Sequence, residues 1–516
     1  MEQNDFDACI IGAGPGGLAA LSALIEPYSA DQLSEDQTTR AGHGHGLQKR
    51  RGPRVCVVDP EPWISTWHKR FKALDIRWLR SPTGAHPDLF DARSLLAYAT
   101  LHGRTDELLD SGAVNEELRA LAETHTGLWH LPSNKLFEDF CNDLATRLPH
   151  TFVRGMAASV RGSDGNFTVS LTDGKELRAR AIVLAVGVPG PARVLPEFDG
   201  VPERFMFHSD LHQGSRLKEV KGNKNVLVIG GGLTAVQAAQ LAIKRGCRVT
   251  LCSRRELTTR HFDVKPTWFD RRVAYRHHFE FFEQPLESRL KHIKAARVGG
   301  SVPPMYMKEL REAEARGEVE LKCVDAQLDT VLSGCVQVKL GSEMRRFDLV
   351  VNACGHVPDC RKLPLISELL ENFPTDVIGG FPVISQDLQW GSCKQLFVVG
   401  ALASLQVGPD AGNLMGLRRA ANIVANVLGL RAWLRDTASV LGNIRGNRYA
   451  ALGSDSESES DSESGSKGSS ADSGESSAND ENEVSKLERK CTDAEASTEA
   501  SSDGAGDSPL ALLGQA

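Results

Sequence analysis

The sequence has no segment that is typical of a transmembrane helix or of a secretory leader. Its first apolar stretch begins near Phe6 and runs directly into a glycine-rich turn. A signal peptide needs a basic start and a longer apolar core, and a membrane span needs about 20 apolar residues. We therefore expect a soluble, cytoplasmic protein that does not bind membranes.

A cysteine framework is also lacking. The 11 cysteines are scattered, and no two of them are spaced as CxxC. An odd count without a pattern predicts a reducing compartment and mostly buried thiols. The adjacent His277 and His278 are expected on a helix, where neighbours point to different faces, so we expect no metal site. No basic stretch is interleaved with aromatic residues, which argues against nucleic-acid binding.

The chain is too long for one compact core, and its charge is uneven. Its 516 residues predict two or three domains. The net charge is −7, but residues 453–516 carry −12 (16 acidic and 4 basic residues), which leaves +5 for the rest. This Ser-rich acidic tail cannot bury enough apolar surface to fold, so we expect it to be disordered. Phosphorylation or protein binding is one interpretation of the tail, and a solubilising role is the other.

The N-terminal stretch DACIIGAGPGGLAALSALI predicts a buried strand, a glycine turn and a helix. In such a turn Gly12 makes the tight bend, Gly14 lets the backbone approach a pyrophosphate, and Gly17 lets the helix pack on the strand. The N-terminus of the helix then faces the phosphates with its positive end. The context of strand and helix on either side makes this pattern more specific than the glycines alone.

A dinucleotide ribose is usually held by an acid at the end of the second strand, about 20 residues beyond the turn. Asp59, in VCVVDP, is the candidate, although it lies 47 residues from Gly12. A polar insertion at 27–53 explains the longer gap. The alternatives are that Asp59 is an ordinary turn residue or that Glu61 takes its place.

The same plan of strand, turn, helix and strand recurs in NKNVLVIGGGLTAVQAAQLAIKRGCRVTLCSRRE, with Gly230, Gly232 and Ala235 as the turn residues. No acid ends its second strand, and Arg254 and Arg255 stand there instead. A guanidinium matches the 2′-phosphate of NADPH, and a charge-assisted contact of about 1.5–3 kcal/mol predicts a roughly 10- to 100-fold preference over NADH. The alternative is a solvated basic turn.

This duplication predicts an α/β fold with two Rossmann-like domains, the second inserted in the first, followed by the disordered acidic tail. We expect the first domain over residues 1–200, with a helical substrate-side insertion at 60–150. The second domain is expected over 201–344, the return to the first over 345–452, and the tail over 453–516.

The two turns resemble those of the two-dinucleotide-binding flavoprotein superfamily, and within it the class B flavin-dependent monooxygenases, including N-hydroxylating ones. LAVGVPGPARVLP around Gly187 and FDLVVNACGHVPD around Gly355 resemble the family's passages into and out of the nicotinamide domain. The resemblance implies FAD at the first turn and NADPH at the second, held by Gly12, Gly14, Gly17 and Asp59 and by Gly230, Gly232 and Arg254 respectively.

Some positions depart from the family pattern. Ala401, in FVVGA, stands where disulfide reductases carry an acid, so Asp410 and Asn413 before a predicted helix are the expected flavin contacts. His208 resembles the histidine of the monooxygenase linker, but seven residues separate it from Gly200 instead of three. Arg80 lies in an LRSP string that resembles the substrate-side segment of N-hydroxylating enzymes. His208 and Arg80 are the candidate catalytic side chains of a reaction centred on the flavin.

Three hypotheses follow for an FAD- and NADPH-dependent chain. The first is a monooxygenase that transfers one oxygen atom of O₂ to a small nucleophilic substrate containing N or S, through a peroxyflavin. The second is an NADPH-dependent reductase of a small acceptor, without a redox disulfide. The third is a flavin-bound regulatory protein of the oxidative-stress growth-inhibitor type. The substrate and the oligomeric state stay open.

Overall fold

The computed structural model of this chain describes residues 5–25, 52–110, 129–187, 190–209, 216–220, 222–268 and 274–428. The chain divides into two units, Met1–Leu452 and Gly453–Ala516, and every described residue belongs to the first. The predicted acidic tail and most of the predicted insertion at 27–53 lie outside the described residues. Within the described ranges, no helix combines the length and apolar character that a membrane crossing requires.

The first sheet has seven strands in the order β5-β2-β1-β8-β7-β6, with β19 also paired to β8. β5, β2, β1, β8 and β19 are mutually parallel, whereas β7 and β6 continue the sheet as antiparallel strands. Parallel strands covered on both faces are apolar throughout, as the buried run Ala8–Ile11 of β1 shows. The bounds are β1 Phe6–Ile11, β2 Val55–Asp59, β5 Thr151–Arg154, β6 Ala157–Ser163, β7 Asn166–Leu171, β8 Glu176–Leu184 and β19 Leu396–Val398.

The second sheet has five parallel strands in the order β12-β11-β10-β16-β9. A separate antiparallel sheet, β13-β14-β15, follows β12 in the chain, and two short strand pairs lie outside these sheets. The bounds are β9 Met206–His208, β10 Asn225–Ile229, β11 Arg248–Ser253, β12 Val319–Cys323, β13 Ala326–Val331, β14 Val336–Leu340, β15 Glu343–Phe347 and β16 Leu349–Asn352, and for the short pairs β3 Leu108–Leu109 with β4 Leu131–Pro132 and β17 Val377–Ile378 with β18 Phe381–Pro382.

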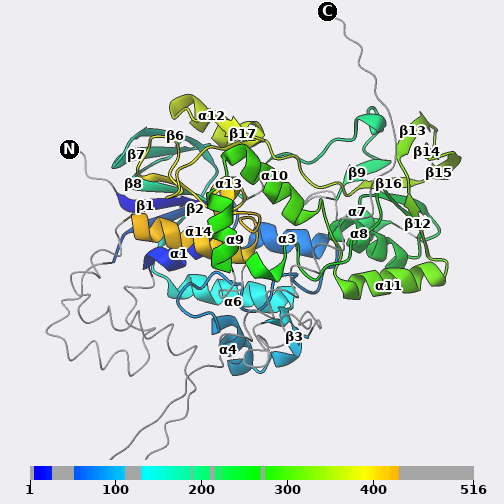
Figure 1. Cartoon of the computed structure of the whole chain (residues 1–516), viewed down its shortest axis with the longest axis horizontal. Coiled ribbons are helices and arrows are strands. Elements are labelled where there is room, and N and C mark those ends of the chain that lie inside the picture. Colours follow the sequence, from blue (N-terminus) through cyan, green and yellow to red (C-terminus); the bar gives the residue numbers. More distant parts are fainter. Residues whose placement is uncertain are drawn as a thin grey trace, which may run out of the picture. The chain divides into compact units, whose positions relative to one another are not determined.

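Helices cover both sheets. In the first, α1 is buried along its whole length and packs against α14, while in the second α8 packs against β11 and α11 (Figure 1). Each of α1 and α8 starts directly after a glycine turn, as the repeated pattern predicts. The bounds are α1 Pro15–Ile25, α8 Leu233–Lys244, α11 Pro304–Ala315, α12 Pro364–Asn372 and α14 Leu414–Val427.

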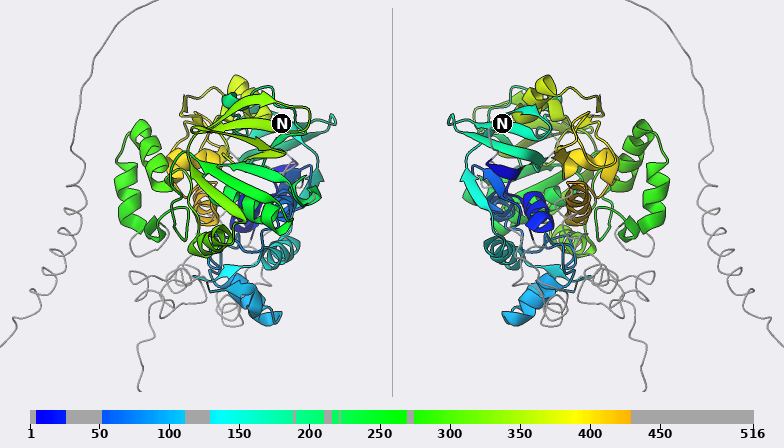
Figure 2. Two further views of the ribbon diagram at one scale, coloured as in Figure 1. Left: turned by 90° about the vertical axis from the view of Figure 1, so that its right-hand side faces the viewer. Right: turned by 90° about the vertical axis from the view of Figure 1, so that its left-hand side faces the viewer.

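Most of the remaining helices lie in two insertions. One follows β2 and lies within the predicted 60–150 segment, and the other separates β11 from α11. We call the unit built around the first sheet the first half and the unit built around the second sheet the second half. In the second insertion α9 and α10, green in Figure 2, pack on each other, and α10 also contacts α13 of the first half. The bounds are α3 Ser65–Ala73, α4 Ser94–Leu101 and α6 Asn134–Arg147 in the first, α9 Ala274–Phe282 and α10 Leu286–Arg297 in the second, and the short helices α7 Arg216–Glu219 and α13 Ser404–Val407 elsewhere.

The order of the strands confirms the predicted fold class. The first sheet consists of six strands that precede residue 185 and of β19 near residue 396. All strands of the second sheet lie in the chain between β8 and β19. Two large cores follow, one around α1 and β1 and one around α8 and β10. The fold is α/β with two Rossmann-like units, the second inserted in the first. The residue numbers at which we place the domain boundaries stay predictions.

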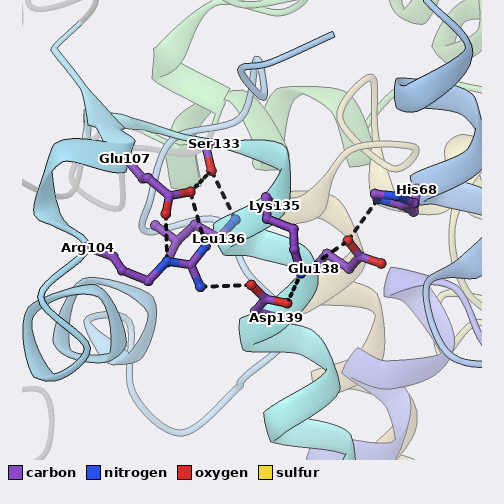
Figure 3. A network of polar contacts seen from close by, with 8 residues as sticks. All are labelled: His68, Arg104, Glu107, Ser133, Lys135, Leu136, Glu138 and Asp139. Carbon is purple, nitrogen blue, oxygen red and sulfur yellow. Dashed lines mark hydrogen bonds and ion pairs between the residues drawn. The ribbon is translucent and has the colours of Figure 1, made fainter. Parts of the chain in front are cut away.

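The start of α6 depends on Ser133. The Ser133 hydroxyl accepts a hydrogen bond from the Leu136 N–H at 3.0 Å, which is the capping arrangement that favours Ser at this position. The same hydroxyl donates to Glu107, and Arg104 bridges Glu107 to Asp139 on α6 at 2.6 and 2.8 Å (Figure 3). One cap therefore joins α6 to the segment around Glu107.

We expect Ser133→Ala to lower the free energy of unfolding by about 1 kcal/mol, because it leaves the first turn of α6 without its cap. Ser94→Ala is the matched control, since the Ser94 hydroxyl at the start of α4 is buried without a hydrogen-bond partner. The measurement is the thermal midpoint of the purified variants. Equal midpoints for the two variants would contradict the role given to Ser133.

A buried histidine fixes the loop between α3 and α4 to α14. His86 is fully buried, and its Nε2 donates to the Ala92 carbonyl at 3.1 Å while its Nδ1 accepts from Arg418 at 3.1 Å. Arg418 also donates to the carbonyls of His86, at 2.8 Å, and Asp88. Burial, together with the charge of Arg418, lowers the pKa of His86 to about 3, so the imidazole is neutral in the folded protein.

Acid should therefore weaken the fold through His86. Its folded-state pKa lies below the ordinary value of 6.5, so the unfolded chain binds the extra proton, and stability is lost as the pH falls below about 6.5. The expected loss from this group between pH 7 and pH 5 is about 2 kcal/mol. His86→Gln should flatten the dependence of the thermal midpoint on pH, whereas His102→Gln, at an exposed histidine, should not. An unchanged slope in His86→Gln would contradict this assignment.

Candidate functional site

A cavity of about 1470 Å³ lies at the carboxyl ends of both parallel sheets. Parallel α/β sheets bind ligands at this edge. The first glycine turn lines the cavity with Gly14, Pro15 and Gly16, and the second lines it with residues 230–234. Two turns that are about 215 residues apart in the chain therefore open onto one space.

The three glycines of the first turn are required for different reasons. Gly12 has φ +116°, and a Cβ there would lie 2.4 Å from the Ala185 carbonyl oxygen. A Cβ on Gly17 would lie 1.9 Å from the Gly12 oxygen, so α1 can approach β1 only at a glycine. A Cβ on Gly14 would meet no atom within 4 Å. Gly14 is thus free of internal constraint, and its bare backbone faces the cavity.

Asp59 lies at the end of β2, as predicted, and its carboxylate is hydrogen-bonded to the backbone of the first turn. Its Oδ2 accepts a hydrogen bond from the Ala13 N–H at 2.7 Å, and its Oδ1 accepts one from the Glu61 N–H at 2.8 Å. Glu61, the predicted alternative, forms an ion pair with Lys69 at 2.8 Å, and the hydrogen bond from Lys69 lowers the pKa of its carboxyl. The structure thus connects Asp59, and not Glu61, to the turn.

The second turn repeats the geometry of the first. Gly230 has φ +154°, and a Cβ there would lie 2.5 Å from the Ala353 carbonyl oxygen and 3.1 Å from the Ala235 Cβ. Gly232 precedes α8 as its N-cap residue. Ala235 is fully buried on α8, in the packing position where the sequence pattern tolerates alanine.

Arg254 and Arg255 follow β11 directly, are exposed, and both line the cavity. The Ser253 hydroxyl donates to the Arg255 carbonyl at 2.6 Å and shapes this corner. The charged residues of the whole lining comprise seven Lys or Arg and only three Asp or Glu. Such an excess of cations suits ligands with several phosphates.

The segment before α14 places Asn413 and Asp410 differently. Asn413 lines the cavity and caps α14, since its Oδ1 accepts from the N–H groups of Met415 and Gly416, both at 3.1 Å. Asp410 is fully buried, does not belong to the lining, and pairs with Arg419 at 2.5 Å, while burial raises the pKa of its carboxyl. The expected flavin contact of Asp410 is therefore not supported, because its carboxylate is buried in the ion pair with Arg419.

Arg80 and His208, the candidate catalytic side chains, both make structural contacts. Arg80 lines the cavity, but its guanidinium donates to the carbonyls of Arg260, His261 and Ser301 and to the Ser301 hydroxyl, all within 3.0 Å. Burial lowers its pKa to about 10, so it stays charged at neutral pH. His208 ends β9, its Nε2 lies 3.0 Å from the Gly355 carbonyl, and it is not part of the lining. These contacts mark neither side chain as a catalytic group.

Sequence reasoning missed the way the insertion between β11 and α11 packs on the first half. Its Arg289 donates to the Leu405 carbonyl at 3.1 Å and to Gln406 Oε1 at 2.7 Å, and its Arg297 donates to the Pro409 carbonyl at 2.9 Å. A small apolar core around Trp268 and Phe281 includes residues of both halves. Scattered arginines and aromatic residues carry no motif that reveals such contacts.

The cavity contains no redox pair of cysteines among the described residues. Cys252 and Cys354 belong to the lining, but their thiols donate to different carbonyls, those of Val324 at 3.0 Å and Ile229 at 3.4 Å. Burial raises the pKa of both thiols. Cys252 is buried and Cys354 is half-buried, and raised pKa values are typical of structural cysteines rather than of reactive thiols.

Comparisons with known proteins agree with this geometry. Residues 106–270, less than half of the chain, match the pyridine nucleotide-disulphide oxidoreductase family. No curated protein sequence matches the chain. Among solved structures, an ornithine N-hydroxylase from Kutzneria sp. 744 matches with a TM-score of 0.60 and 16% identity over 83% of this chain and 99% of that one.

Two further structures match as well. A cadaverine monooxygenase from Erwinia amylovora gives a TM-score of 0.59 at 16% identity, over 83% of this chain and 95% of that one. An L-lysine 6-monooxygenase from Pseudomonas syringae gives 0.56 at 18% identity, over 82% and 99%. Identities this low speak for the fold alone. The chain has the fold of these three enzymes.

Proposed function

We propose that this chain is an FAD-dependent, NADPH-consuming monooxygenase that transfers one oxygen atom of O₂ to an amine nitrogen of a small substrate. The observation that carries the proposal is the single cavity onto which both glycine turns open. Two dinucleotides bound at these turns would meet inside one space. The flavin supplies the redox and oxygen chemistry, and the protein supplies binding, orientation and exclusion of water.

The residues of the first turn fit FAD. Gly12 and Gly17 let strand and helix approach, Gly14 leaves room for a pyrophosphate, and the N-terminus of α1 adds its positive end. We assign Asp59 to the ribose side, where it already holds the turn at Ala13. Asn413 and the N-terminus of α14 are assigned to the flavin ring. The FAD-bound cadaverine monooxygenase has the same fold.

The residues of the second turn fit NADPH. Gly230, Gly232 and Ala235 form the turn, and Arg254 and Arg255 lie where a 2′-phosphate is expected. No acid ends β11 to hold an unmodified ribose. The ornithine N-hydroxylase structure contains reduced FAD, NADP⁺ and L-ornithine.

The other lining residues are suited to oxygen transfer. Apolar side chains of Trp67, Phe262, Ile293, Phe381 and Met415 face the cavity. Such apolar side chains beside the reacting atoms would keep water from a reactive oxygen donor and from the amine. The chemistry requires no protein nucleophile, in line with the structural roles of Arg80 and His208.

A reductase of a small acceptor is the second candidate, because the matching family is one of pyridine nucleotide-disulphide oxidoreductases. Reduction of a disulfide would need a thiol pair near the flavin. The two cysteines of the lining are bonded separately and beside the second turn. This argues against a disulfide reductase only. We place oxygen transfer above the reduction of another small acceptor because the solved structures with the same fold include three monooxygenases or N-hydroxylases of amines. The cytoplasmic location and the binding or phosphorylation of the tail remain predictions.

Gly14→Val should abolish or strongly weaken FAD binding while leaving the apoprotein folded. Its side chain would enter the cavity and meet no protein atom within 4 Å of its Cβ, so the loss would come from the ligand alone. We expect the dissociation constant of FAD to rise at least about tenfold. Gly334→Val is the control, since Gly334 is equally free of neighbours. Unchanged FAD affinity in Gly14→Val would refute the first site.

The function itself is tested by two measurements on FAD-loaded protein. Without oxygen, NADPH should bleach the visible absorption of the flavin. In air, one amine of a panel that includes ornithine, lysine and cadaverine should become hydroxylated in proportion to the NADPH consumed. Bleaching with release of hydrogen peroxide alone, for every amine, would favour the reductase. The absence of bleaching would contradict both candidates.

A further inference from the structure

Three residues that no sequence motif marks lie against the second dinucleotide turn. Gly299, Gly300 and Ser301 follow α10, and all three line the cavity. The adjoining strand-like contact fixes them, because the Val302 N–H donates to the Thr258 carbonyl at 2.8 Å and the Arg260 N–H to the Val302 carbonyl at 3.0 Å. We name residues 299–301 the shelf.

The backbone of the shelf packs on the glycine turn. A Cβ on Gly300, whose φ is +112°, would lie 3.2 Å from the Gly232 Cα and 3.7 Å from its nitrogen. Conversely, the nearest atom to a Cβ on Gly232 is the Gly300 Cα, at 3.8 Å. The two glycines thus form a close backbone contact directly at the N-terminus of α8.

The side chain of Arg255, one of the two arginines of the second site, packs against the shelf at Gly299. A Cβ on Gly299 would lie 2.0 Å from Arg255 Nη2 and 2.9 Å from its Cζ. The guanidinium therefore occupies the space that a side chain at position 299 would take. A glycine here leaves room for the Arg255 head group against the backbone.

The first half of the chain holds the shelf in place. Ser301 is 2% exposed, and Arg80 donates to its carbonyl at 3.0 Å and to its hydroxyl at 2.8 Å. The remaining bonds of Arg80 end on the carbonyls of Arg260 and His261, at 2.9 and 3.0 Å. Four hydrogen bonds in a planar fork give Arg80 a geometry that lysine cannot reproduce.

We infer that the shelf is a third component of the NADPH site, which positions Arg255 for the 2′-phosphate and is itself positioned by Arg80. This inference rests on the proposed binding of NADPH at the second turn. Gly299 acts on 2′-phosphate recognition through Arg255, and Gly300 acts on the turn that both NADPH and NADH use. Arg80 is a positioning residue, not a catalytic one.

Gly299→Ala provides the sharpest test. The three atoms nearest to the added methyl group all belong to the flexible end of Arg255, which can move aside. The φ of +64° adds backbone strain, which the control variant shares. We expect the preference for NADP⁺ over NAD⁺ to fall about tenfold, with NAD⁺ affinity unchanged. Gly317→Ala is the matched control, because its φ of +72° is close to the +64° of Gly299 and it has no neighbour within 4 Å.

The readout is calorimetric titration of FAD-loaded protein with NADP⁺, NAD⁺ and the fragment 2′,5′-ADP. Arg255→Ala should reproduce the effect of Gly299→Ala, and the double variant should show little further loss. Gly300→Ala should weaken NADP⁺ and NAD⁺ alike. Arg80→Lys should also weaken NADP⁺ about tenfold at unchanged FAD content, because charge without the fork cannot hold the shelf.

The outcomes separate the inference from the proposed function. If the unmodified protein binds NADP⁺ no better than NAD⁺, the assignment of NADPH fails on its own. If it prefers NADP⁺ and Gly299→Ala keeps that preference, the shelf has no role in recognition and the inference is overturned. Full affinity in Arg80→Lys would overturn the role of Arg80 alone.

Discussion

The position of both glycine turns depends on the same kind of backbone contact, made once by Gly12 and once by Gly230. Gly12 donates its N–H to the Val58 carbonyl at 2.9 Å, and Gly230 donates to the Cys252 carbonyl at the same distance. On the other side each glycine lies against a residue just beyond its neighbouring strand, Ala185 or Ala353, with room for a hydrogen but not for a Cβ. Each turn thus lies between two strand ends, at a glycine where a Cβ would clash.

The same contacts relate the two halves to each other. Ala185 and Ala353 begin the two passages of the chain between the halves, and these passages pair with one another. The Arg193 N–H donates to the Gly355 carbonyl at 2.8 Å, and the Val357 N–H donates to the Pro191 carbonyl at 2.9 Å. Residues that follow Ala185 and Ala353 in the two passages therefore form a backbone-paired link between the halves. The separation of the two turns is set by backbone hydrogen bonds rather than by side chains alone.

The elements that depend on local pattern were predictable from the sequence. The two buried strands with their glycine turns and Asp59 at the end of β2 follow from periodicity and from backbone chemistry within a few residues. Asp410 shows the limit of prediction from local sequence. Its burial against Arg419 depends on packing that the neighbouring residues in the sequence do not indicate. Arg80 shows it again, since three of its four bonds join it to carbonyl groups about 180 to 220 residues away.

Carbonyl oxygens are poor markers in a sequence because every residue has one. The arginines that hold the cavity together, Arg80, Arg289 and Arg297, bind mainly such oxygens, so neither partner is recognisable in advance. Their bonds cross from one half to the other and attach the insertion between β11 and α11 to the first half. The wall of the cavity, including the shelf, is consequently shared between the halves. A nucleotide at the second turn would then be held partly by residues that the first half positions.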